Sequence, residues 1–376
     1  MPGSIRWFAL LAFLLAAACA GAQELDASLN ESVVMVGKKL LLGSVDLETT
    51  LYKPAGDGPF PIVVINHGKA PGDPRFQSRY RPVVAVRYFL ARGYAVVVPM
   101  RQGFAHSTGT YNSVQCNVGS NGLVQAEDVR AVLDYVTAQA WADRTRVLVV
   151  GQSHGGWTTL AFGTLDYPGV KGLVNFAGGL RNESCTAWKD GLIGAAGGYG
   201  RDTHVPSLWF YGDNDSYFDA YTFRGMLEKY TAAGGPARLV AFGTFGSDSH
   251  LLFGVRAGAP IWQPEVTRFL AALGLPSAPL AETDAVVIPI PPRSDFAAIG
   301  DDAKVPYVRD GGRTGYRVFL GKRPPRAFAI APNGGWGWAA GGEDAPERAL
   351  ANCSRRAAAA CRLYAVDDYT VWKDAP

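Results

Sequence analysis

The residues most suggestive of chemistry surround Ser153, in the segment Gly151-Gln152-Ser153-His154-Gly155. The apolar stretch VLVV precedes this segment, and an apolar, helix-like stretch follows it. A serine between two such glycines, at a tight turn from a buried strand into a helix, is held in a strained and exposed position. The pattern therefore predicts that Ser153 is a nucleophile; the alternative is a glycine-rich turn with a structural role only.

A serine hydroxyl becomes a nucleophile only when a base removes its proton, so a histidine is required, together with a carboxylate that orients it. The chain has five histidines, at positions 67, 106, 154, 204 and 250. Only His250, in the segment GTFGSDSHLLFG, follows the last apolar run of the predicted core. We therefore expect His250 to be the general base; the alternative is a loop histidine beside an apolar patch.

Three aspartates follow the apolar run VPSLWFYG and are candidates for the acid: Asp213, Asp215 and Asp219. Asp213 is expected to stay close to the end of the strand. Asp219 is expected to begin the next helix, where an aspartate at the first position has a capping role. We therefore predict that Asp215 is the acid and keep the other two as alternatives.

Attack on a carbonyl also requires hydrogen-bond donors for the oxyanion that develops. The backbone N–H of His154, the residue after the nucleophile, is the first expected donor. The second is expected in the loop INHGKAPGD, where Lys69 directly follows His67 and Gly68. Both donors would act through the backbone, so neither side chain is implied.

Apolar runs and helical patterns alternate over most of the chain. This alternation predicts an α/β fold with a mostly parallel, doubly wound sheet that helices cover on both faces. Residues Ser32–Pro54 favour strands and show little helical periodicity. The expected buried strands are Pro61–Asn66, Tyr94–Pro99, Arg146–Gly151 and the later runs VKGLVNFAGG, VPSLWFYG and ARLVAFG; the expected helices are Arg81–Gly93, Gly122–Gln139 and Phe218–Ala233.

Composition changes near Leu275, where a proline-rich stretch begins that can continue neither a helix nor a strand. We therefore predict a catalytic domain at residues 32–274, a linker at 275–300, and a small α+β domain of unknown role at 301–376. The elements assigned to the small domain are Tyr316–Leu320, Ala327–Ala331, a helix near Ala345–Ala359 and the segment CRLYAVDDYTVW.

The N-terminus has the pattern of a secretory signal. One positive charge precedes the apolar stretch Trp7–Ala18, and a small-residue motif ends at Ala22. The apolar stretch is too short to span a bilayer, so we predict cleavage after residues 1–22 and a secreted or periplasmic protein without a stable membrane span. Lipidation of Cys19 is less favoured because Ala16 replaces the leucine usual three residues before a lipidated cysteine.

Cleavage would leave four cysteines: Cys116, Cys185, Cys353 and Cys361. An even number in an exported protein suggests two disulfides, although four cysteines allow three connectivities. Cys353 and Cys361 are close in sequence at one end of a predicted helix, so we expect them to pair. Cys116 would then pair with Cys185.

The overall composition excludes several classes of function. A formal net charge of +3, with no basic run interleaved with aromatics, argues against a nucleic-acid partner. The sequence has no His-x-x-x-His helix, no clustered carboxylates and no glycine-rich phosphate loop with a lysine-serine ending. We therefore expect neither a metal nor a cofactor.

The order Ser153, Asp215, His250 and the His67-Gly68 loop together resemble the α/β-hydrolase fold. From about Ser32 to Gly274, the chain is similar to the dienelactone hydrolase and prolyl-oligopeptidase-like groups. The segment PMRQGFAHSTGTY resembles their arginine-glycine loop, and AEDVRAVLDYV resembles their helix before the nucleophile. Dienelactone hydrolases carry a cysteine nucleophile where this chain has serine, so the resemblance does not extend to their substrate. The C-terminal segments GWGWA, ALANC and CRLYAVDDYTVW resemble a small cysteine-paired domain of exported bacterial proteins, which brings no catalytic residue.

These observations predict an exported serine hydrolase that cleaves a small-molecule or polymer ester through an acyl-enzyme on Ser153. An ester is preferred to a peptide because no β-propeller or aromatic N-terminal domain that would screen peptides is recognised. The alternatives are a serine peptidase or aminoacyl-amide hydrolase of the prolyl-oligopeptidase type, or an inactive binding protein on the same fold. The inactive form usually lacks the serine or the histidine, whereas this chain keeps every candidate.

Overall fold

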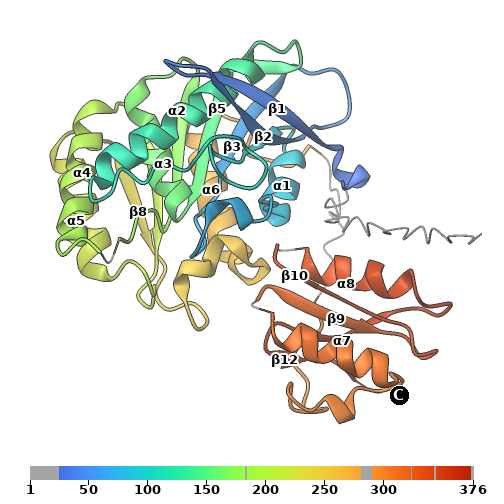
Figure 1. Cartoon of the computed structure of the whole chain (residues 1–376). Helices are drawn as coiled ribbons and strands as arrows, with labels where there is room; N and C mark the ends of the chain where they lie inside the picture. The colour runs from blue at the N-terminus through green and yellow to red at the C-terminus, as the bar shows by residue number, and fades with distance from the viewer. Residues whose placement is uncertain (1–24, 183, 281–289, 323, 343, 374–376) are drawn as a thin grey trace, which may run out of the picture.

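The computed structural model describes residues 25–280 and 290–373, except Glu183, Arg323 and Glu343. The predicted signal peptide, its cleavage site and Cys19 lie outside the described residues. Two separate sheets organise the chain (Figure 1): an eight-stranded sheet in the order β1-β2-β4-β3-β5-β6-β7-β8, and a four-stranded sheet in the order β10-β9-β11-β12. No helix among the described residues is long and apolar enough to cross a membrane.

The large sheet begins with an antiparallel hairpin of β1 (Glu31–Lys39) and β2 (Ser44–Tyr52), and β2 also pairs antiparallel with β4. The other neighbours are all parallel. The parallel strands are β3 (Phe60–Asn66), β4 (Ala95–Pro99), β5 (Ala142–Gln152), β6 (Val170–Phe176), β7 (Ser207–Tyr211) and β8 (Ala237–Ala241). The chain therefore has the predicted α/β fold with a mostly parallel sheet.

The central strands are almost entirely apolar because helices cover both faces of the sheet. One face packs on α2 (Val118–Thr137), α3 (His154–Phe162), α4 (Trp188–Asp202) and α5 (Ala220–Ala232). The other face packs on α1 (Val83–Leu90), α6 (Ala259–Ala272) and the 3₁₀ helix η4 (Ser249–Gly254). Because the strands are parallel, the loops at their carboxyl ends gather at one edge of this sheet, where ligands bind in such folds.

The small C-terminal unit is an α+β sandwich. Its elements are α7 (Asp310–Leu320), β9 (Arg326–Ile330), β10 (Trp336–Ala340), α8 (Ala345–Ser354), β11 (Arg362–Val366) and β12 (Tyr369–Thr370). Alternate residues of β9 face opposite sides: Ala327 and Ala329 pack toward α8, whereas Phe328 and Ile330 pack toward α7. Both faces of the small sheet are therefore covered by helices.

Two details of the small unit differ from the sequence-based expectation. Tyr316–Leu320 forms the second half of α7 rather than a separate element. The helix expected near Ala345–Ala359 ends at Ser354, because the chain turns back there to reach β11. This turn brings Cys353 and Cys361 together in a disulfide.

The second disulfide joins Cys116, just before α2, to Cys185, just before α4. Both predicted pairings are therefore present in the structure. The Cys116–Cys185 bond connects two segments that follow the carboxyl ends of β4 and β6, so it ties together loops at the edge where Ser153 lies.

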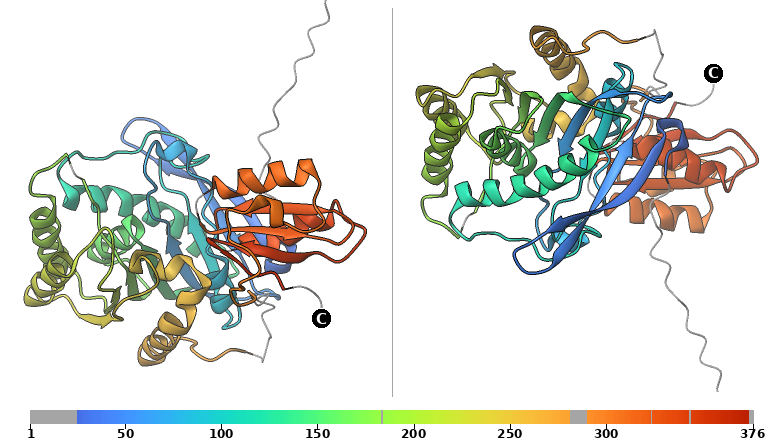
Figure 2. Two further views of the ribbon diagram at one scale, coloured as in Figure 1. Left: turned by 90° about the horizontal axis from the view of Figure 1, so that it is seen from below. Right: turned by 90° about the horizontal axis from the view of Figure 1, so that it is seen from above.

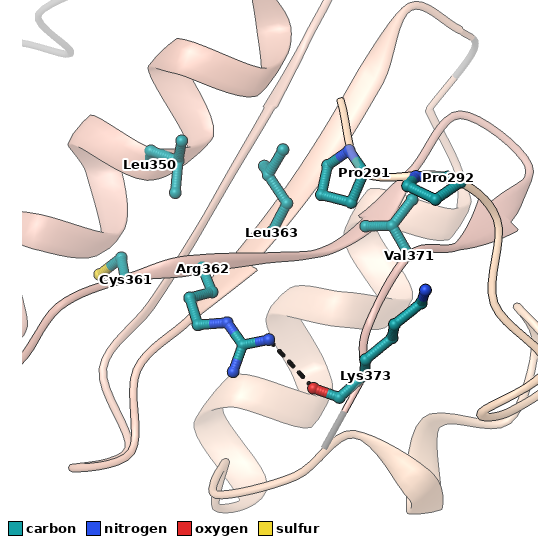
Figure 3. Close-up of a pocket in the computed structure, with 8 residues that line it drawn as sticks. All are labelled: Pro291, Pro292, Leu350, Cys361, Arg362, Leu363, Val371 and Lys373. Atoms are coloured by element: carbon teal, nitrogen blue, oxygen red, sulfur yellow. Dashed lines mark hydrogen bonds between the residues drawn. The ribbon is translucent and has the colours of Figure 1, made fainter. Parts of the chain in front are cut away.

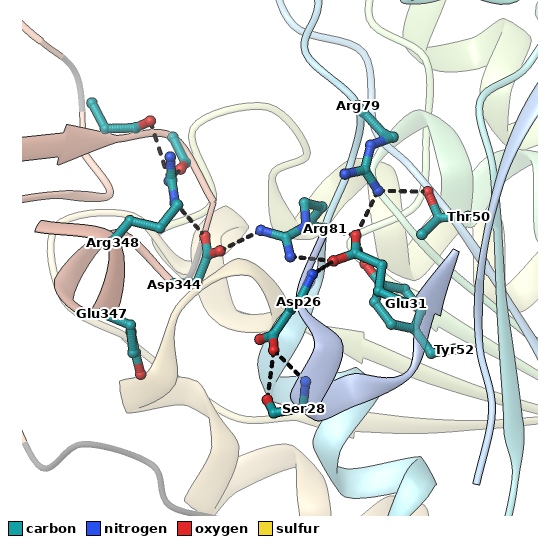
Figure 4. A network of polar contacts seen from close by, with 12 residues as sticks. Asp26, Ser28, Glu31, Thr50, Tyr52, Arg79, Arg81, Asp344, Glu347 and Arg348 are labelled. Carbon is teal, nitrogen blue, oxygen red and sulfur yellow. Dashed lines mark hydrogen bonds and ion pairs between the residues drawn. The ribbon is translucent and has the colours of Figure 1, made fainter. Parts of the chain in front are cut away.

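The small unit packs against one side of the larger one (Figure 2), and a buried ion network joins them (Figure 4). Arg81, which is 4% exposed, donates to both carboxylate oxygens of Glu31 and to Asp344 Oδ2 at 2.6 Å. Arg79 also donates to Glu31, and Arg348 donates to Asp344. Arg81 therefore connects the first strand of the large sheet to the residue that precedes α8.

Candidate active site

Ser153 lies between the end of β5 and the start of α3, at the carboxyl edge of the large sheet. Its backbone has φ 57° and ψ −125°, a strained conformation for a residue with a side chain. A serine at this position usually caps the helix, yet the Ser153 side chain makes no cap hydrogen bond. The Ser153 hydroxyl therefore does not cap the helix that it precedes.

The neighbouring glycines are required by close backbone contacts. A Cβ at Gly151 would lie 2.1 Å from the carbonyl oxygen of Gly155, and a Cβ at Gly155 would lie 2.1 Å from that of Asn66. Any side chain at either position would push α3 away from β3 and β5. The Gly-x-Ser-x-Gly pattern is thus explained by how tightly the turn packs against two strands.

His250 lies on η4, which follows β8, and its side chain is buried beside Asp215. The next residues anchor this segment: Leu252 and Phe253 are buried, and the Phe253 ring stacks on Phe176 with centroids 4.2 Å apart. Gln152 Nε2 donates to the His250 carbonyl oxygen at 3.1 Å, so the His250 segment lies directly beside the nucleophile turn.

Asp215 follows β7 and accepts from His250 Nδ1 at 3.1 Å. The carboxylate is fixed in turn by the backbone N–H groups of Tyr217 and Phe218, which donate to Oδ1 at 2.8 and 2.9 Å. The Tyr217 ring lies 4.4 Å from the His250 ring and covers the pair. With Nδ1 engaged by Asp215, His250 keeps Nε2 for proton transfer.

The other acid candidates lie elsewhere. Asp213 is exposed, and its backbone N–H donates to Gly243. Asp219 caps α5 by accepting from the Thr222 N–H, and it pairs with Lys189. Both side chains therefore have roles away from His250, and Asp215 is the one that the structure brings to the histidine.

The remaining histidines are also accounted for. His106 is exposed and pairs with Glu48, and His204 is exposed on the loop before β7. His67 and His154 are buried behind the nucleophile turn. None of these four contacts Asp215 in the described part of the structure, whereas His250 does.

The loop expected to supply an oxyanion donor lies against Ser153. A Cβ at Gly68 would be 3.3 Å from the Ser153 Cβ, so the His67-Gly68-Lys69 backbone passes beside Ser153. His154 is the first residue of α3, where backbone N–H groups have no partner within the helix. The two backbones named from the sequence therefore border Ser153 from different sides.

Positive charge surrounds this region. Lys69 is half-buried, donates to the carbonyl oxygens of Ala70 and Gly72, and has a pKa that burial lowers. Arg101 is fully buried behind His67 and His154, and burial lowers its pKa to about 10. Sequence reasoning assigned Arg101 to a loop only; the signal available was a charged residue directly after a fully apolar strand.

A separate pocket of about 380 Å³ lies in the small unit (Figure 3). Leu350, Leu363 and Val371 form its apolar part, and Arg362 and Lys373 stand at its border. It is built from α8, β11 and the segment around Pro291, far along the chain from Ser153, and no predicted catalytic residue lines it. The pocket is therefore not the candidate active site.

Several solved structures are similar to this protein at low sequence identity. Among solved structures, the protein is similar to the Pyrococcus furiosus esterase Pf2001, with 16% identity, 67% of this chain and 96% of that chain covered, and a TM-score of 0.49. It is also similar to Thermogutta terrifontis esterase 2, with 20% identity, coverage of 66% and 96%, and a TM-score of 0.46. A puromycin-hydrolyzing peptidase of Mycobacterium tuberculosis gives 18% identity, coverage of 61% and 38%, and a TM-score of 0.45. No curated protein matches the sequence.

One protein family matches the sequence directly. The family described as X-Pro dipeptidyl-peptidase (S15 family) matches residues 43–233. This span contains the nucleophile turn with Ser153 and also Asp215, and it ends before His250. The protein therefore belongs to the S15 peptidase family and is a serine hydrolase with the α/β-hydrolase fold.

Proposed function

We propose that this serine hydrolase is exported and cleaves a carboxylic ester through an acyl-enzyme on Ser153. The observation that carries the proposal is the Asp215–His250 pair beside a strained serine whose side chain does not cap its helix. Asp215 orients His250 and stabilises its protonated form, and His250 is the general base. This geometry supports the proposed roles of Ser153, Asp215 and His250.

The reaction follows from these positions. His250 Nε2 removes the Ser153 hydroxyl proton as the oxygen attacks the ester carbonyl. The backbone N–H groups of Lys69 and His154 stabilise the resulting oxyanion. The intermediate collapses as His250 returns the proton to the leaving alcohol, and a water activated by His250 then releases the acid and frees Ser153.

The charges near the site favour an ester over a dipeptide with a free α-ammonium. A dipeptidyl-peptidase must hold that ammonium group, which requires a carboxylate with spare acceptor capacity. The carboxylates beside His250 are already engaged: Asp215 with His250, and Asp248 with Ser216 and the His250 N–H. The charged groups on the other side, Lys69 and Arg101, would repel an ammonium. We therefore propose an acyl group that is neutral or anionic.

Peptide hydrolysis is the second candidate, because the family that matches the chain is described as X-Pro dipeptidyl-peptidase. The two candidates differ in the group that leaves and in the charge at the far end of the acyl portion. An X-Pro-anilide with a free amino terminus tests the peptidase, and alkyl and aryl esters of neutral acids test the esterase.

Export is proposed from the N-terminal signal pattern and is supported by the two disulfides, which persist in oxidising compartments. N-terminal sequencing of the protein recovered from culture medium and periplasm would test it. A mature chain that begins after Ala22 is expected. Recovery of the uncut chain from the cytoplasm would contradict it.

The decisive experiment for the chemistry uses a fluorophosphonate probe and both substrate classes. Wild-type protein should be labelled at Ser153 and should turn over esters faster than the X-Pro-anilide. Ser153→Ala should lose both labelling and turnover while its thermal unfolding is unchanged. Full activity in Ser153→Ala would disprove the proposed nucleophile, and faster cleavage of the anilide would favour the peptidase.

A further inference from the structure

Arg101 is a buried cation directly behind the two loops that border Ser153. It follows β4, its side chain is fully buried, and its pKa of about 10 leaves it protonated at neutral pH. A buried charge is ordinarily paired with an opposite charge, because desolvation of an unpaired ion is costly. The partners of Arg101 therefore need to be identified.

The direct polar partners of the Arg101 side chain are neutral. Its Nε donates to Gln125 Oε1 at 3.1 Å, its Nη2 donates to His154 Nδ1 at 3.2 Å, and the same Nη2 lies 3.5 Å from His67 Nδ1. Its Nη1 has no hydrogen-bond partner among the described residues. Asp128 attracts the guanidinium from a greater distance, but that carboxylate is already held by Lys38 at 2.6 Å and by the Gln102 N–H at 2.8 Å.

Arg101 also determines the proton positions on both buried histidines. Because an arginine only donates, His154 Nδ1 must accept, and its Nε2–H donates to Asn121 Oδ1 at 2.7 Å. The Arg101 backbone N–H donates to His67 Nε2 at 3.1 Å, so His67 Nδ1 carries the proton and donates to the Gly68 carbonyl at 2.6 Å. The Nε2 of Gln77 at 3.3 Å and the Nη2 of Arg101 at 3.5 Å then lie near this N–H without bonding to it. Burial and the Arg101 charge both lower the pKa of each histidine well below its usual value, so both remain neutral.

These contacts connect Arg101 to the two backbones that border the nucleophile. His154 carries one proposed oxyanion donor on its own N–H. His67 holds the carbonyl of Gly68, the residue before the second donor, Lys69. A single buried side chain and its backbone N–H thus support both halves of the proposed oxyanion site.

We propose that Arg101 is a positioning residue of the hydrolase reaction, which aligns both oxyanion loops and supplies uncompensated positive charge behind the oxyanion. This inference rests on the proposed function. Neutral partners matter because a carboxylate bound to Arg101 would cancel its field at the reacting carbonyl. A fixed charge in a water-excluded site stabilises a developing oxyanion without having to reorganise during the reaction.

The test compares three substitutions on the full-length protein: Arg101→Lys keeps the charge, Arg101→Gln keeps a hydrogen-bond donor without charge, and Arg101→Met keeps only bulk. We expect the two neutral variants to lower kcat by roughly 10- to 100-fold, an effect of the size of losing one oxyanion donor or less, with KM changed less than about threefold. Arg101→Lys should recover at least about tenfold of this loss. Thermal unfolding identifies any variant that does not fold. If only one of the two neutral variants folds, that variant is compared with Arg101→Lys and the wild type.

A second readout tests whether the loss falls on the oxyanion. A trifluoromethyl ketone forms an oxyanion adduct with the nucleophile, whereas the matching methyl ketone binds without that charge. The affinity for the trifluoromethyl ketone should fall in parallel with kcat in the neutral variants, while the affinity for the methyl ketone should stay constant. Equal losses in Arg101→Lys and Arg101→Gln, or unchanged trifluoromethyl ketone affinity, would overturn the inference. Fluorophosphonate labelling separates that outcome from failure of the proposed function. If the wild type is labelled and Ser153→Ala is not, the proposed function stands and only the inference about Arg101 fails.

Discussion

Two buried arginines of this protein, Arg81 and Arg101, lie in opposite electrostatic surroundings. Arg81 donates to two carboxylates, Glu31 and Asp344, which raise its pKa against the effect of burial. Arg101 donates to Gln125 and His154, which are neutral, and burial lowers its pKa to about 10. The arginine charge is therefore neutralised by carboxylates at position 81 and is not neutralised by its direct partners at position 101.

The difference indicates different uses. The charge of Arg81 is neutralised by Glu31 and Asp344. Arg81 therefore acts by holding the first strand of the large sheet to the small unit. The charge of Arg101 is left available beside the site at which a negative charge would form. Substitutions that compare the two arginines should therefore separate stability from catalysis.

The largest effect is expected for Arg81→Met. Removing the arginine takes the shared cation from the buried carboxylates of Glu31 and Asp344. Each carboxylate keeps one other cation, Arg79 or Arg348, so we expect a cost of about 3 kcal/mol of unfolding free energy, at the lower end of the range for a broken buried ion pair. Activity per folded molecule should change less than about twofold, because no contact of Arg81 reaches Ser153 or His250. Urea unfolding and ester turnover measure the two quantities.

A matched control for this variant is Arg87→Met, in α1, the helix that begins just after Arg81. Arg87 forms a partly exposed ion pair with Asp26 at 3.8 Å, which should contribute less than about 1 kcal/mol. If Arg81→Met were no more destabilising than Arg87→Met, Arg81 would not be the neutralised structural ion described above.

The second effect concerns Glu31 and depends on pH. Burial would raise the pKa of Glu31, but hydrogen bonds from Arg81 and Arg79 outweigh it and lower this pKa to about 2. A group with a lowered folded-state pKa stabilises the protein above its unfolded pKa and loses that effect as the pH falls toward the folded value. Glu31→Gln should therefore cost roughly 2–3 kcal/mol at pH 7, and the difference should narrow between about pH 4.5 and pH 2.

Unfolding of wild type and Glu31→Gln at pH 7, 5 and 3 tests this dependence. A difference that stays constant over this range would show that Glu31 contributes through shape and not through its charge. Arg101 offers the contrasting case. No carboxylate of the described residues bonds to its side chain directly, so its removal should show little acid-dependent change of this kind.

Much of the fold follows from local patterns in the sequence. The apolar runs within β3, β4, β5 and β7 are predicted within a few residues, because the parts of these strands that are buried on both faces are mostly apolar. Helices α4 and α6 were missed. The first contains five glycines and the second contains Pro264, so tertiary packing and not helix propensity determines them.

The site was predictable where a residue type has a fixed place relative to a strand end. Ser153, Asp215 and His250 follow β5, β7 and β8, and the fold brings the ends of these parallel strands to one edge. The Arg81–Asp344 contact could not be predicted, because it joins residues 263 positions apart with no motif around either. The neutral surroundings of Arg101 cannot be predicted either, since they depend on which residues the fold buries beside the guanidinium.

A smaller effect is expected for Asp344→Asn. Arg81 keeps Glu31 as a partner in this variant, so no buried charge is left alone, but Arg348 and Arg81 both lose an ionic acceptor. The expected cost is about 1–2 kcal/mol, seen as faster hydrogen exchange in α8 with little change in the large sheet. Uniform loss of protection across both sheets would show that the two units unfold as one.

The smallest effect is expected for Glu347, which pairs with Arg256 on the chain segment that follows η4. This ion pair is partly exposed, with side-chain exposures of 12% and 22%, so Glu347→Gln should cost less than about 1 kcal/mol. Its position is nevertheless informative, because Arg256 lies just beyond the helix that carries His250. If the small unit only stabilises the protein, kcat should stay within about twofold, and the exchange Arg256→Glu with Glu347→Arg should restore any lost stability. A fall in kcat of tenfold or more at unchanged unfolding free energy, reversed by the exchange, would instead show that the small unit helps to position His250. Arg256 would then affect catalysis through an ion pair, and the contrast between paired arginines that stabilise and unpaired arginines that support catalysis would not hold for it.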